Sequence, residues 1–263
     1  MAKHEQDGLR AELDELAAKF RHHEALYRAG KPEISDAAFD ELAERYAELA
    51  DALDVPESER VDAKPGADHT EGFTVVVHRV PMLSLEKLTP NRKDSKGQPM
   101  PLGEQLGQWW QRRREDLELS SGTPLPVYIE PKIDGISVSL LYEHGALVRA
   151  VTRGDGKRGD DITRQVQSAR AVPAHLGKKG SFEVRGELYW PRAAFDKHNA
   201  LLRRNGEEEI ANPRNGTAGM MKRKDPAGLE LAGITSFLYQ IPWFEGVSLP
   251  GRQSEVLAWL AEH

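Results

Sequence analysis

The most informative stretch of the sequence is Tyr128-Ile129-Glu130-Pro131-Lys132-Ile133-Asp134-Gly135. It places the pattern Lys-x-Asp-Gly directly after an apolar, β-prone run. A lysine amine attacks phosphorus only when it is uncharged, and burial or neighbouring cations favour that form. The alternative is an ordinary tight turn, in which Gly135 supplies a positive φ. The residues in the rest of the sequence indicate whether Lys132 is a nucleophile or part of an ordinary turn.

An arginine follows at the end of the predicted hairpin. Thr152-Arg153-Gly154-Asp155-Gly156 ends the second strand after the lysine. This order would return Arg153 to the side of Lys132, where its planar, permanently charged donors suit a phosphate or ribose hydroxyls. The alternative is a Gly-Asp-Gly turn with a solvated arginine.

A carboxylate ends another predicted strand, Glu183-Val184-Arg185-Gly186-Glu187. Gly186 permits a ligand to approach closely. Glu187 could then bind ribose hydroxyls or a water molecule of hydrated magnesium. Alternatively, Arg185 and Glu187 are the outward residues of an alternating strand.

The longest distinctive run is Asn212-Pro213-Arg214-Asn215-Gly216-Thr217-Ala218-Gly219. Its first residues predict a turn and its small residues predict the start of a helix, whose exposed N–H groups favour an anion. Lys222, Arg223 and Lys224 follow. They either present cations to a phosphate or form a solvated helix end.

The composition limits the class of protein. The chain has 263 residues, of which 39% are hydrophobic and 30% charged, as in ordinary globular proteins. No apolar run approaches the ~20 residues of a membrane span, and the polar N-terminus is not a signal peptide. The chain has no cysteine, which excludes disulfides, thiolate zinc sites and a cysteine nucleophile. We therefore expect a cytoplasmic protein with no membrane contact and no zinc.

Charge is unevenly distributed along the chain. Residues 1–71 hold 9 Lys and Arg against 19 Asp and Glu, whereas residues 72–263 hold 27 against 23. The first part would repel a polyanion and the second would tolerate one.

The sequence predicts two parts, a helical lobe with its linker over residues 1–70 and a larger domain over residues 71–263. In the lobe, apolar residues recur at helical spacing along two segments, and Ser35 is placed to cap the second. Residues 54–70 are polar and contain prolines, which is typical of a linker. The two apolar stripes are Leu9, Leu13, Leu16, Phe20 and Leu26, and Phe39, Leu42, Tyr46, Leu49 and Leu53.

The larger domain combines predicted strands with a few helices. One helix is expected from Leu102 and another over residues 255–262. The apolar or alternating segments that predict strands are 73–77, 81–85, 127–132, 136–142, 147–153 and 182–190. Successive strands joined by short turns predict an α+β fold with a mainly antiparallel sheet.

Six motifs, in this order along the chain, resemble the adenylation domain of bacterial NAD-dependent DNA ligases. The resemblance implies a nucleotidyltransferase domain of the ATP-grasp-like ligase type, preceded by a lobe that recognises the nicotinamide mononucleotide half of NAD. It covers nearly the whole chain from about residue 8. The motifs lie at residues 32–40, 78–86, 130–135, 152–156, 183–187 and 212–219.

The resemblance implies roles for residues of the larger domain. Lys132 would form a covalent lysyl–AMP bond, and Glu130 would recognise the adenine amino group. Arg153 and Glu187 would contact the ribose and phosphate of the adenosine. Ser84 and Leu85 would line the pocket wall. Asp134 and Glu187 would hold magnesium through water. Arg214 and Lys222 would contact phosphates or DNA. Lys222 stands where the family is expected to have an arginine.

In the lobe, the resemblance implies that Tyr27, Asp36 and Asp40 hold nicotinamide mononucleotide. Asp36 and Asp40 are one helical turn apart, so both can face one ligand, and Tyr27 can stack on its cationic ring. Alternatively, Asp36 only complements the helix dipole. Arg28 and Phe39 replace a histidine and a tyrosine that are usual in the family. Because Phe39 lacks the hydroxyl, weaker NAD binding is expected.

The implied activity is transfer of AMP from NAD to Lys132 with Mg²⁺, for sealing nicked double-stranded DNA in replication and repair. Family members continue with further phosphate-contacting strands and DNA-binding domains, so the adenylation domain is expected to be truncated at its C-terminus and unable to seal DNA unaided. Two alternatives stay open: a catalytically impaired NAD-binding module derived from a ligase, and an ATP-dependent enzyme that adenylates nucleic-acid ends. The sequence indicates no oligomeric state.

Overall fold

The structure is a computed structural model that describes residues 3–28, 33–34, 36–56, 59–61, 70–83, 85–90, 92, 98–177 and 180–262, without the side chains of 3–7, 27–28, 36–37, 40 and 44. The chain divides into two compact units, Met1–Met82 together with Lys132–His263, and Leu83–Pro131. The boundary expected near residue 70 stays a prediction. In the described part of the chain, no helix has the length and apolar character needed to cross a membrane.

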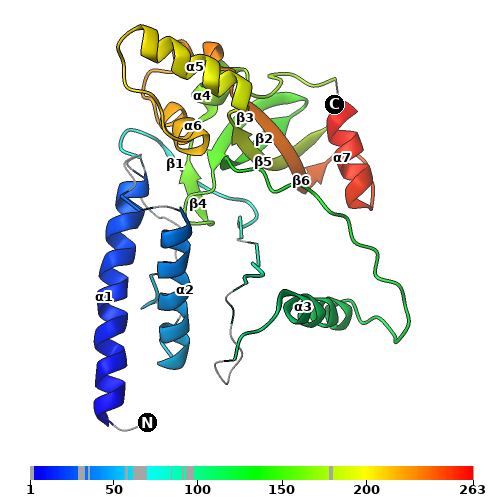
Figure 1. Cartoon of the computed structure of the whole chain (residues 1–263). Coiled ribbons are helices and arrows are strands. Elements are labelled where there is room, and N and C mark those ends of the chain that lie inside the picture. The colour runs from blue at the N-terminus through cyan, green and yellow to red at the C-terminus, as the bar shows by residue number, and fades with distance from the viewer. Residues whose placement is uncertain are drawn as a thin grey trace. The chain divides into compact units, whose positions relative to one another are not determined.

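The N-terminal helices α1 (Lys3–Arg28) and α2 (Asp36–Ala52) lie side by side (Figure 1). Their predicted apolar stripes meet, since the buried residues of this pair include Leu13, Tyr46 and Leu49. Around this core, Arg45 donates to the Glu12 carboxylate at 2.7 Å. The predicted helical hairpin is confirmed, whereas its expected cap Ser35 and residues 62–69 of the linker lie outside the described residues.

The larger part of the same unit is built on a four-stranded antiparallel sheet of order β3-β2-β5-β6 (Figure 1). Three of its strands are β2 (Ile136–Glu143), β3 (Ala146–Thr152) and β5 (Ser181–Tyr189), all close to the predicted bounds. The fourth strand is β6 (Thr235–Glu245). The short strands β1 (Val75–Val77) and β4 (Arg158–Asp160) form a separate antiparallel pair. The α+β prediction is confirmed.

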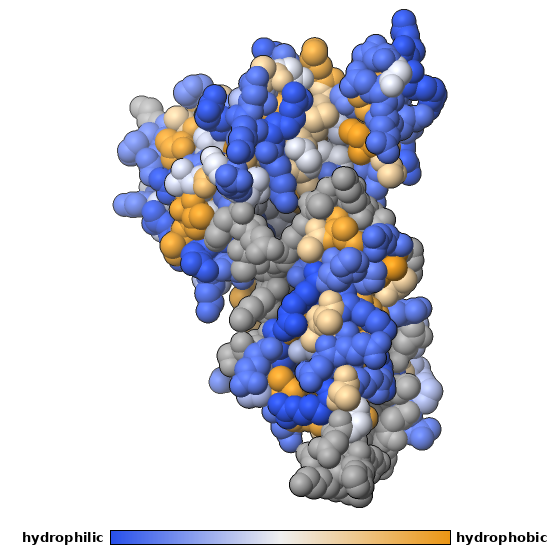
Figure 2. Space-filling model, turned by 90° about the vertical axis from the view of Figure 1, so that its left-hand side faces the viewer, coloured by the Kyte–Doolittle hydropathy of each residue, from blue (hydrophilic) through white to orange (hydrophobic). Residues whose placement is uncertain are grey.

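One face of the sheet carries the hydrophobic core. Side chains alternate between the faces of a strand, so the buried Val138, Leu140 and Tyr142 of β2 share a face with apolar residues of β5. The helices that pack apolar residues into this core are α4 (Thr163–Ala169), α5 (Arg192–Arg204), α6 (Pro213–Met221) and α7 (Gln253–Glu262). On the face drawn in Figure 2, hydrophilic residues predominate and apolar residues form small, separate patches.

The opposite face of the sheet is polar and yet largely covered. It presents Ser137 and Ser139 from β2, and Glu183, Arg185 and Glu187 from the neighbouring β5. Four of these five residues therefore stand in paired positions of the two central strands, Ser137 opposite Glu187 and Ser139 opposite Arg185. This polar face is where the sequence motifs meet.

The strand predicted over residues 127–132 is wrong. These residues form no strand, and Val127, Tyr128 and Ile129 are 52%, 54% and 87% exposed. β-propensity mainly reflects packing against a neighbouring strand, and this segment has none among the described residues. The predicted helix from Leu102 is confirmed as α3 (Leu102–Asp116) in the unit Leu83–Pro131. The strand predicted over residues 81–85 is also wrong, since residues 81–83 and 85 form none. Strands β4 and β6 and helices α4 and α5 were not predicted.

Candidate active site

Ser137, the second residue of β2, joins two of the predicted site residues. Its hydroxyl donates to Oε1 of Glu187 at 2.7 Å, across the β2–β5 pair. Its carbonyl oxygen accepts from the backbone N–H of Arg153 at 3.2 Å. The ends of β3 and β5 therefore lie on either side of the start of β2, directly after the Lys-x-Asp-Gly motif.

Burial raises the pKa of Glu187 above its ordinary value of 4.5. The hydrogen bond from Ser137 and the positive charges of Lys132, Arg214 and Arg153 oppose this effect by favouring the carboxylate. These three cations come from motifs that are up to 82 positions apart in the sequence. The structure thus gathers them around one half-buried carboxyl group.

Replacing Glu187 by glutamine is expected to stabilise the fold at neutral pH. A carboxyl group whose pKa is raised by folding contributes most to stability below its unfolded pKa, and this contribution is lost as the pH rises through the folded pKa. Glutamine keeps an oxygen for the Ser137 hydroxyl and carries no charge. Thermal unfolding from pH 4 to pH 8 should therefore show a Tm gain in Glu187→Gln that grows with pH. A variant that is less stable than the parent at pH 8 would contradict this account.

Lys132 and Asp134 lie in the exposed, irregular segment that leads into β2. Asp134 accepts a hydrogen bond from Nη1 of Arg214 at 3.1 Å, and the side chains of Arg214 and Asp134 are 43% and 62% exposed. A surface ion pair of this kind adds little stability. It does hold the guanidinium of Arg214 beside the lysine motif.

Gly135 ends the motif for a reason other than the predicted one. Its backbone does not have a positive φ. Instead, a Cβ atom at this position would lie 2.2 Å from the carbonyl oxygen of Leu188 in β5. The glycine therefore lets the chain enter the sheet against the neighbouring backbone.

Gly135→Ala is expected to destabilise the protein by about 1–3 kcal/mol, because the clash is with backbone that has to shift. Chemical denaturation measures the loss. The matched control is Gly219→Ala in α6, where a Cβ would meet nothing within 4 Å. That change should be neutral or stabilising by about 0.5–1 kcal/mol. Equal stability of the two variants would show that the approach to Leu188 imposes no constraint.

Arg153 opens the tight turn between β3 and β4. Gly154 and Gly156 have φ values of 55° and 84°, and Asp155 Oδ1 accepts from two backbone N–H groups of the turn at 2.9 and 2.6 Å. The Gly-Asp-Gly turn and the placement of Arg153 beside Lys132 were alternatives in the sequence. The structure contains the turn, which places the backbone of Arg153 at the end of β3, and the charges of Arg153 and Lys132 both act on Glu187.

Helix α6 positions Arg214 at its first turn. As predicted, the helix follows an Asn-Pro turn: the Asn212 side chain accepts from the N–H groups of Arg214 and Asn215 at 2.8 and 3.2 Å. This is the usual cap of a helix N-terminus. Lys222 lies at the other end of α6, as its exposed C-cap residue. The structure therefore brings Arg214 to Glu187 and Lys132, and places Lys222 about two helical turns away along α6.

A buried ion pair beside this site was not found from the sequence. Arg185 and Glu183 are each 4% exposed, and Arg185 Nε donates to Glu183 Oε1 at 2.9 Å. Ser139 Oγ donates to the same oxygen at 2.8 Å. The alternative interpretation of Arg185 as an outward residue of an alternating strand is wrong, because the polar face of β5 is covered at this position.

The segment that covers this face is residues 78–82. Arg185 donates to the carbonyl oxygens of Val80 and Pro81, the latter at 3.0 Å. The guanidinium of Arg79 lies 3.7 Å from the ring centre of Trp243 in β6, and Met82 N donates to Gly156 O at 2.7 Å. The predicted motif at 78–86 is thus fixed to the sheet through its first half.

The arrangement agrees with a comparison to known protein families. The family model of the NAD-dependent DNA ligase adenylation domain matches residues 70–263. The chain belongs to this family. It is 36% identical to a DNA ligase of Hahella chejuensis over 92% of its own length, and 38% identical to a DNA ligase of Heliobacterium modesticaldum over 95%. It spans 34% and 35% of those two relatives.

Three residues implied by the ligase resemblance belong to the unit Leu83–Pro131. Leu85 is 75% exposed and Glu130 is partly exposed, whereas Ser84 lies outside the described residues. The position of this unit relative to the other one is not determined (Figure 1), so the assignment of these residues to the adenylate pocket stays a prediction.

The lobe residues implied by the ligase resemblance are Tyr27, Asp36 and Asp40. The first lies in the last turn of α1 and the other two in the first turns of α2, but their side chains lie outside the described ones. Phe39, which replaces the usual tyrosine, packs with its ring centre 5.0 Å from that of Phe20 in α1. Its ring therefore takes part in joining the two helices.

Proposed function

We propose that the chain carries out the adenylation step of an NAD-dependent DNA ligase, with Lys132 as the nucleophile. The observation that carries this proposal is the gathering of Lys132, Arg153 and Arg214 around the half-buried Glu187. Three cations beside one carboxyl group suit a ligand that combines phosphates with ribose hydroxyls. Membership of the adenylation-domain family supports the same assignment.

In the reaction, the uncharged Nζ of Lys132 attacks the phosphorus of the AMP half of NAD. An N–P bond forms and the bond from that phosphorus to the bridging oxygen breaks. Nicotinamide mononucleotide leaves with the bonding electrons, and the amine gives up a proton. Charge on the phosphoryl oxygens would be stabilised by Arg153 and Arg214, of which Arg214 is already held by its hydrogen bond to Asp134.

Glu187 has the second role in this proposal, as the acceptor for ribose hydroxyls. Its Oε1 is occupied by Ser137, which leaves the other oxygen for a ligand. Glu187 and Asp134 are hard oxygen donors, and Mg²⁺ typically keeps its waters and uses one or two carboxylates with substrate phosphates. These two residues would hold hydrated Mg²⁺ through water, and the ion would neutralise charge on the phosphates.

The lobe would provide the preference for NAD. Tyr27, Asp36 and Asp40 are proposed to hold the nicotinamide mononucleotide half, because Asp36 and Asp40 stand one turn apart at the start of α2. ATP lacks the group that these residues would bind.

In a whole ligase, the AMP would pass from Lys132 to the 5′-phosphate at a nick in double-stranded DNA. The 3′-hydroxyl would then displace it. Arg214 and Lys222, at the two ends of α6, are proposed to face these phosphates. The excess of Lys and Arg over residues 72–263 is compatible with such a polyanion.

The test is incubation of the chain with Mg²⁺ and either NAD or ATP, followed by intact-mass measurement and assay of released nicotinamide mononucleotide. We expect one AMP adduct per chain from NAD, with one equivalent of mononucleotide released. An adduct from ATP alone would contradict the NAD assignment. No adduct from either nucleotide would contradict the catalytic proposal.

A further inference from the structure

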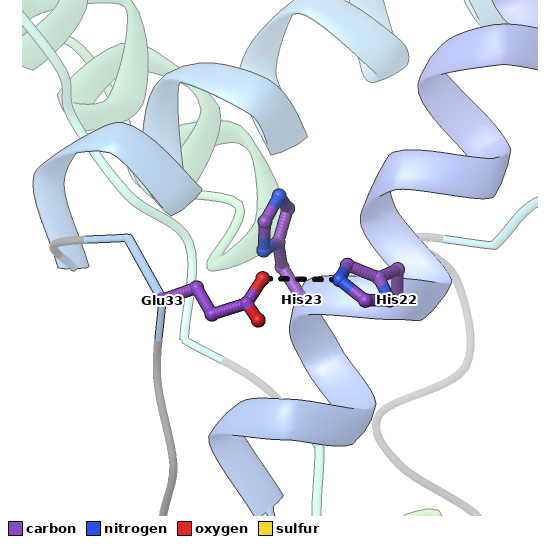
Figure 3. A group of neighbouring side chains, drawn as sticks. All are labelled: His22, His23 and Glu33. Carbon is purple, nitrogen blue, oxygen red and sulfur yellow. Dashed lines mark hydrogen bonds and ion pairs between the residues drawn. The ribbon is translucent and has the colours of Figure 1, made fainter.

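Outside the proposed active site, three metal-ligating side chains meet in the helical lobe. His22 and His23 lie near the end of α1, and Glu33 lies in the segment that precedes α2 (Figure 3). Their candidate ligand atoms all lie within 4.8 Å of one another. Nε2 of His22 is 3.1 Å from Oε2 of Glu33.

One atom of this group is left without a hydrogen bond. Nδ1 of His23 is buried and has no partner among the described residues. Figure 3 shows the His23 ring with a nitrogen directed toward the Glu33 carboxylate. A buried polar atom without a partner destabilises the fold, and an ion or water molecule commonly satisfies it.

We propose that His22, His23 and Glu33 form a binding site for a transition-metal dication of the Zn²⁺ type. Two imidazole nitrogens and one carboxylate oxygen are a usual protein ligand set for Zn²⁺, with water in the fourth position. Mg²⁺ and Ca²⁺ prefer oxygen donors alone. This proposal departs from the expectation of no zinc, because the absence of cysteine excludes only thiolate sites and leaves a site of histidine and glutamate open.

To bind a metal ion, the three candidate ligand atoms have to move only slightly closer together. Ligand bonds of about 2.0–2.1 Å at tetrahedral angles put neighbouring donor atoms about 3.3 Å apart. The side chains of His22 and Glu33 are each 59% exposed, so both can rotate toward such a centre. The bound metal would link the end of α1 to the segment before α2. The site does not depend on the chemistry of Lys132.

The experiment uses the untagged 263-residue chain after removal of metal by EDTA. Zn²⁺ is titrated in competition with a chromophoric chelator, and Tm is measured with and without Zn²⁺. We expect one Zn²⁺ per chain at the tightest site, a higher Tm with the metal, and at least tenfold weaker binding in both His23→Ala and Glu33→Gln. Millimolar Mg²⁺ should not compete.

The matched control is His144→Asn. His144 is exposed, lies outside the lobe and has a φ of 50°, which asparagine tolerates. The affinity of the His144→Asn variant for Zn²⁺ should equal that of the parent chain. Circular dichroism should show the same helix content in His23→Ala as in the parent chain. The proposal is overturned if the chain binds no Zn²⁺, or if Glu33→Gln and His23→Ala both bind it as tightly as His144→Asn.

Discussion

Lys132→Ala is expected to form no AMP adduct with NAD, with the rate of adenylation falling by about 10³-fold or more. The reason is that alanine has no lone pair to attack phosphorus, and the bond to AMP cannot form elsewhere in the pocket. Arg153, Glu187 and Arg214 would remain in place, since Lys132 is exposed and lies outside the core. Intact mass and released nicotinamide mononucleotide, followed over time, measure the effect.

Two variants separate the nucleophile from its charge. Lys132→Arg keeps a cation beside Glu187, but a guanidinium stays protonated and is not a nucleophile. It should therefore also form no adduct. Lys197→Ala removes an exposed lysine of α5 outside the site and should adenylate at the parent rate. If Lys132→Ala still acquires one AMP, the nucleophile is another residue and the proposed mechanism is wrong.

The sequence predicted the hairpin β2–β3 well because its information is local. Two mainly apolar segments flank the turn at Glu143-His144-Gly145, and each pairs with the next strand along the chain. Helix α6 was predicted for the same reason, since Asn212 and Pro213 mark its first turn. Once that hairpin is formed, the backbone N–H of Arg153 donates to the carbonyl oxygen of Ser137, near the start of the strand that follows the lysine motif.

The covering of the polar face of β5 could not be predicted from the sequence. Alternation shows that Glu183 and Arg185 share a face, but not that residues 78–82 pack over it. The pairing involves residues 104 and 105 positions apart, Pro81 and Val80 with Arg185. Likewise, residues 127–132 have the apolar pattern of a strand, which led to the wrong prediction. The sequence does not show whether a neighbouring strand is present to pair with them.

Arg185→Leu is expected to lower the free energy of unfolding by about 3–5 kcal/mol. It leaves the Glu183 carboxylate buried without its counter-ion, and breaking one partner of a buried pair costs about this much. It also leaves the Val80 and Pro81 carbonyl oxygens without their donor. Urea unfolding measures the loss. Arg203→Leu is the matched control, because its ion pair with Glu209 is exposed and should contribute less than about 1 kcal/mol.

Combining Arg185→Leu with Glu183→Leu distinguishes two roles of Arg185, neutralising the charge of Glu183 and positioning residues 78–82. If the buried charge of Glu183 is the main cost, the double variant should recover much of the lost stability, since apolar replacement of a buried pair is often nearly neutral. Adenylation, which we expect Arg185→Leu to impair, should not recover with it, because residues 78–82 would still lack the Arg185 donor that fixes them over the sheet beside Gly156. A double variant that regains both stability and adenylation would show that Arg185 serves only to neutralise Glu183. Recovery of stability alone would identify the arginine as a positioning residue for the segment that leads toward the predicted pocket wall.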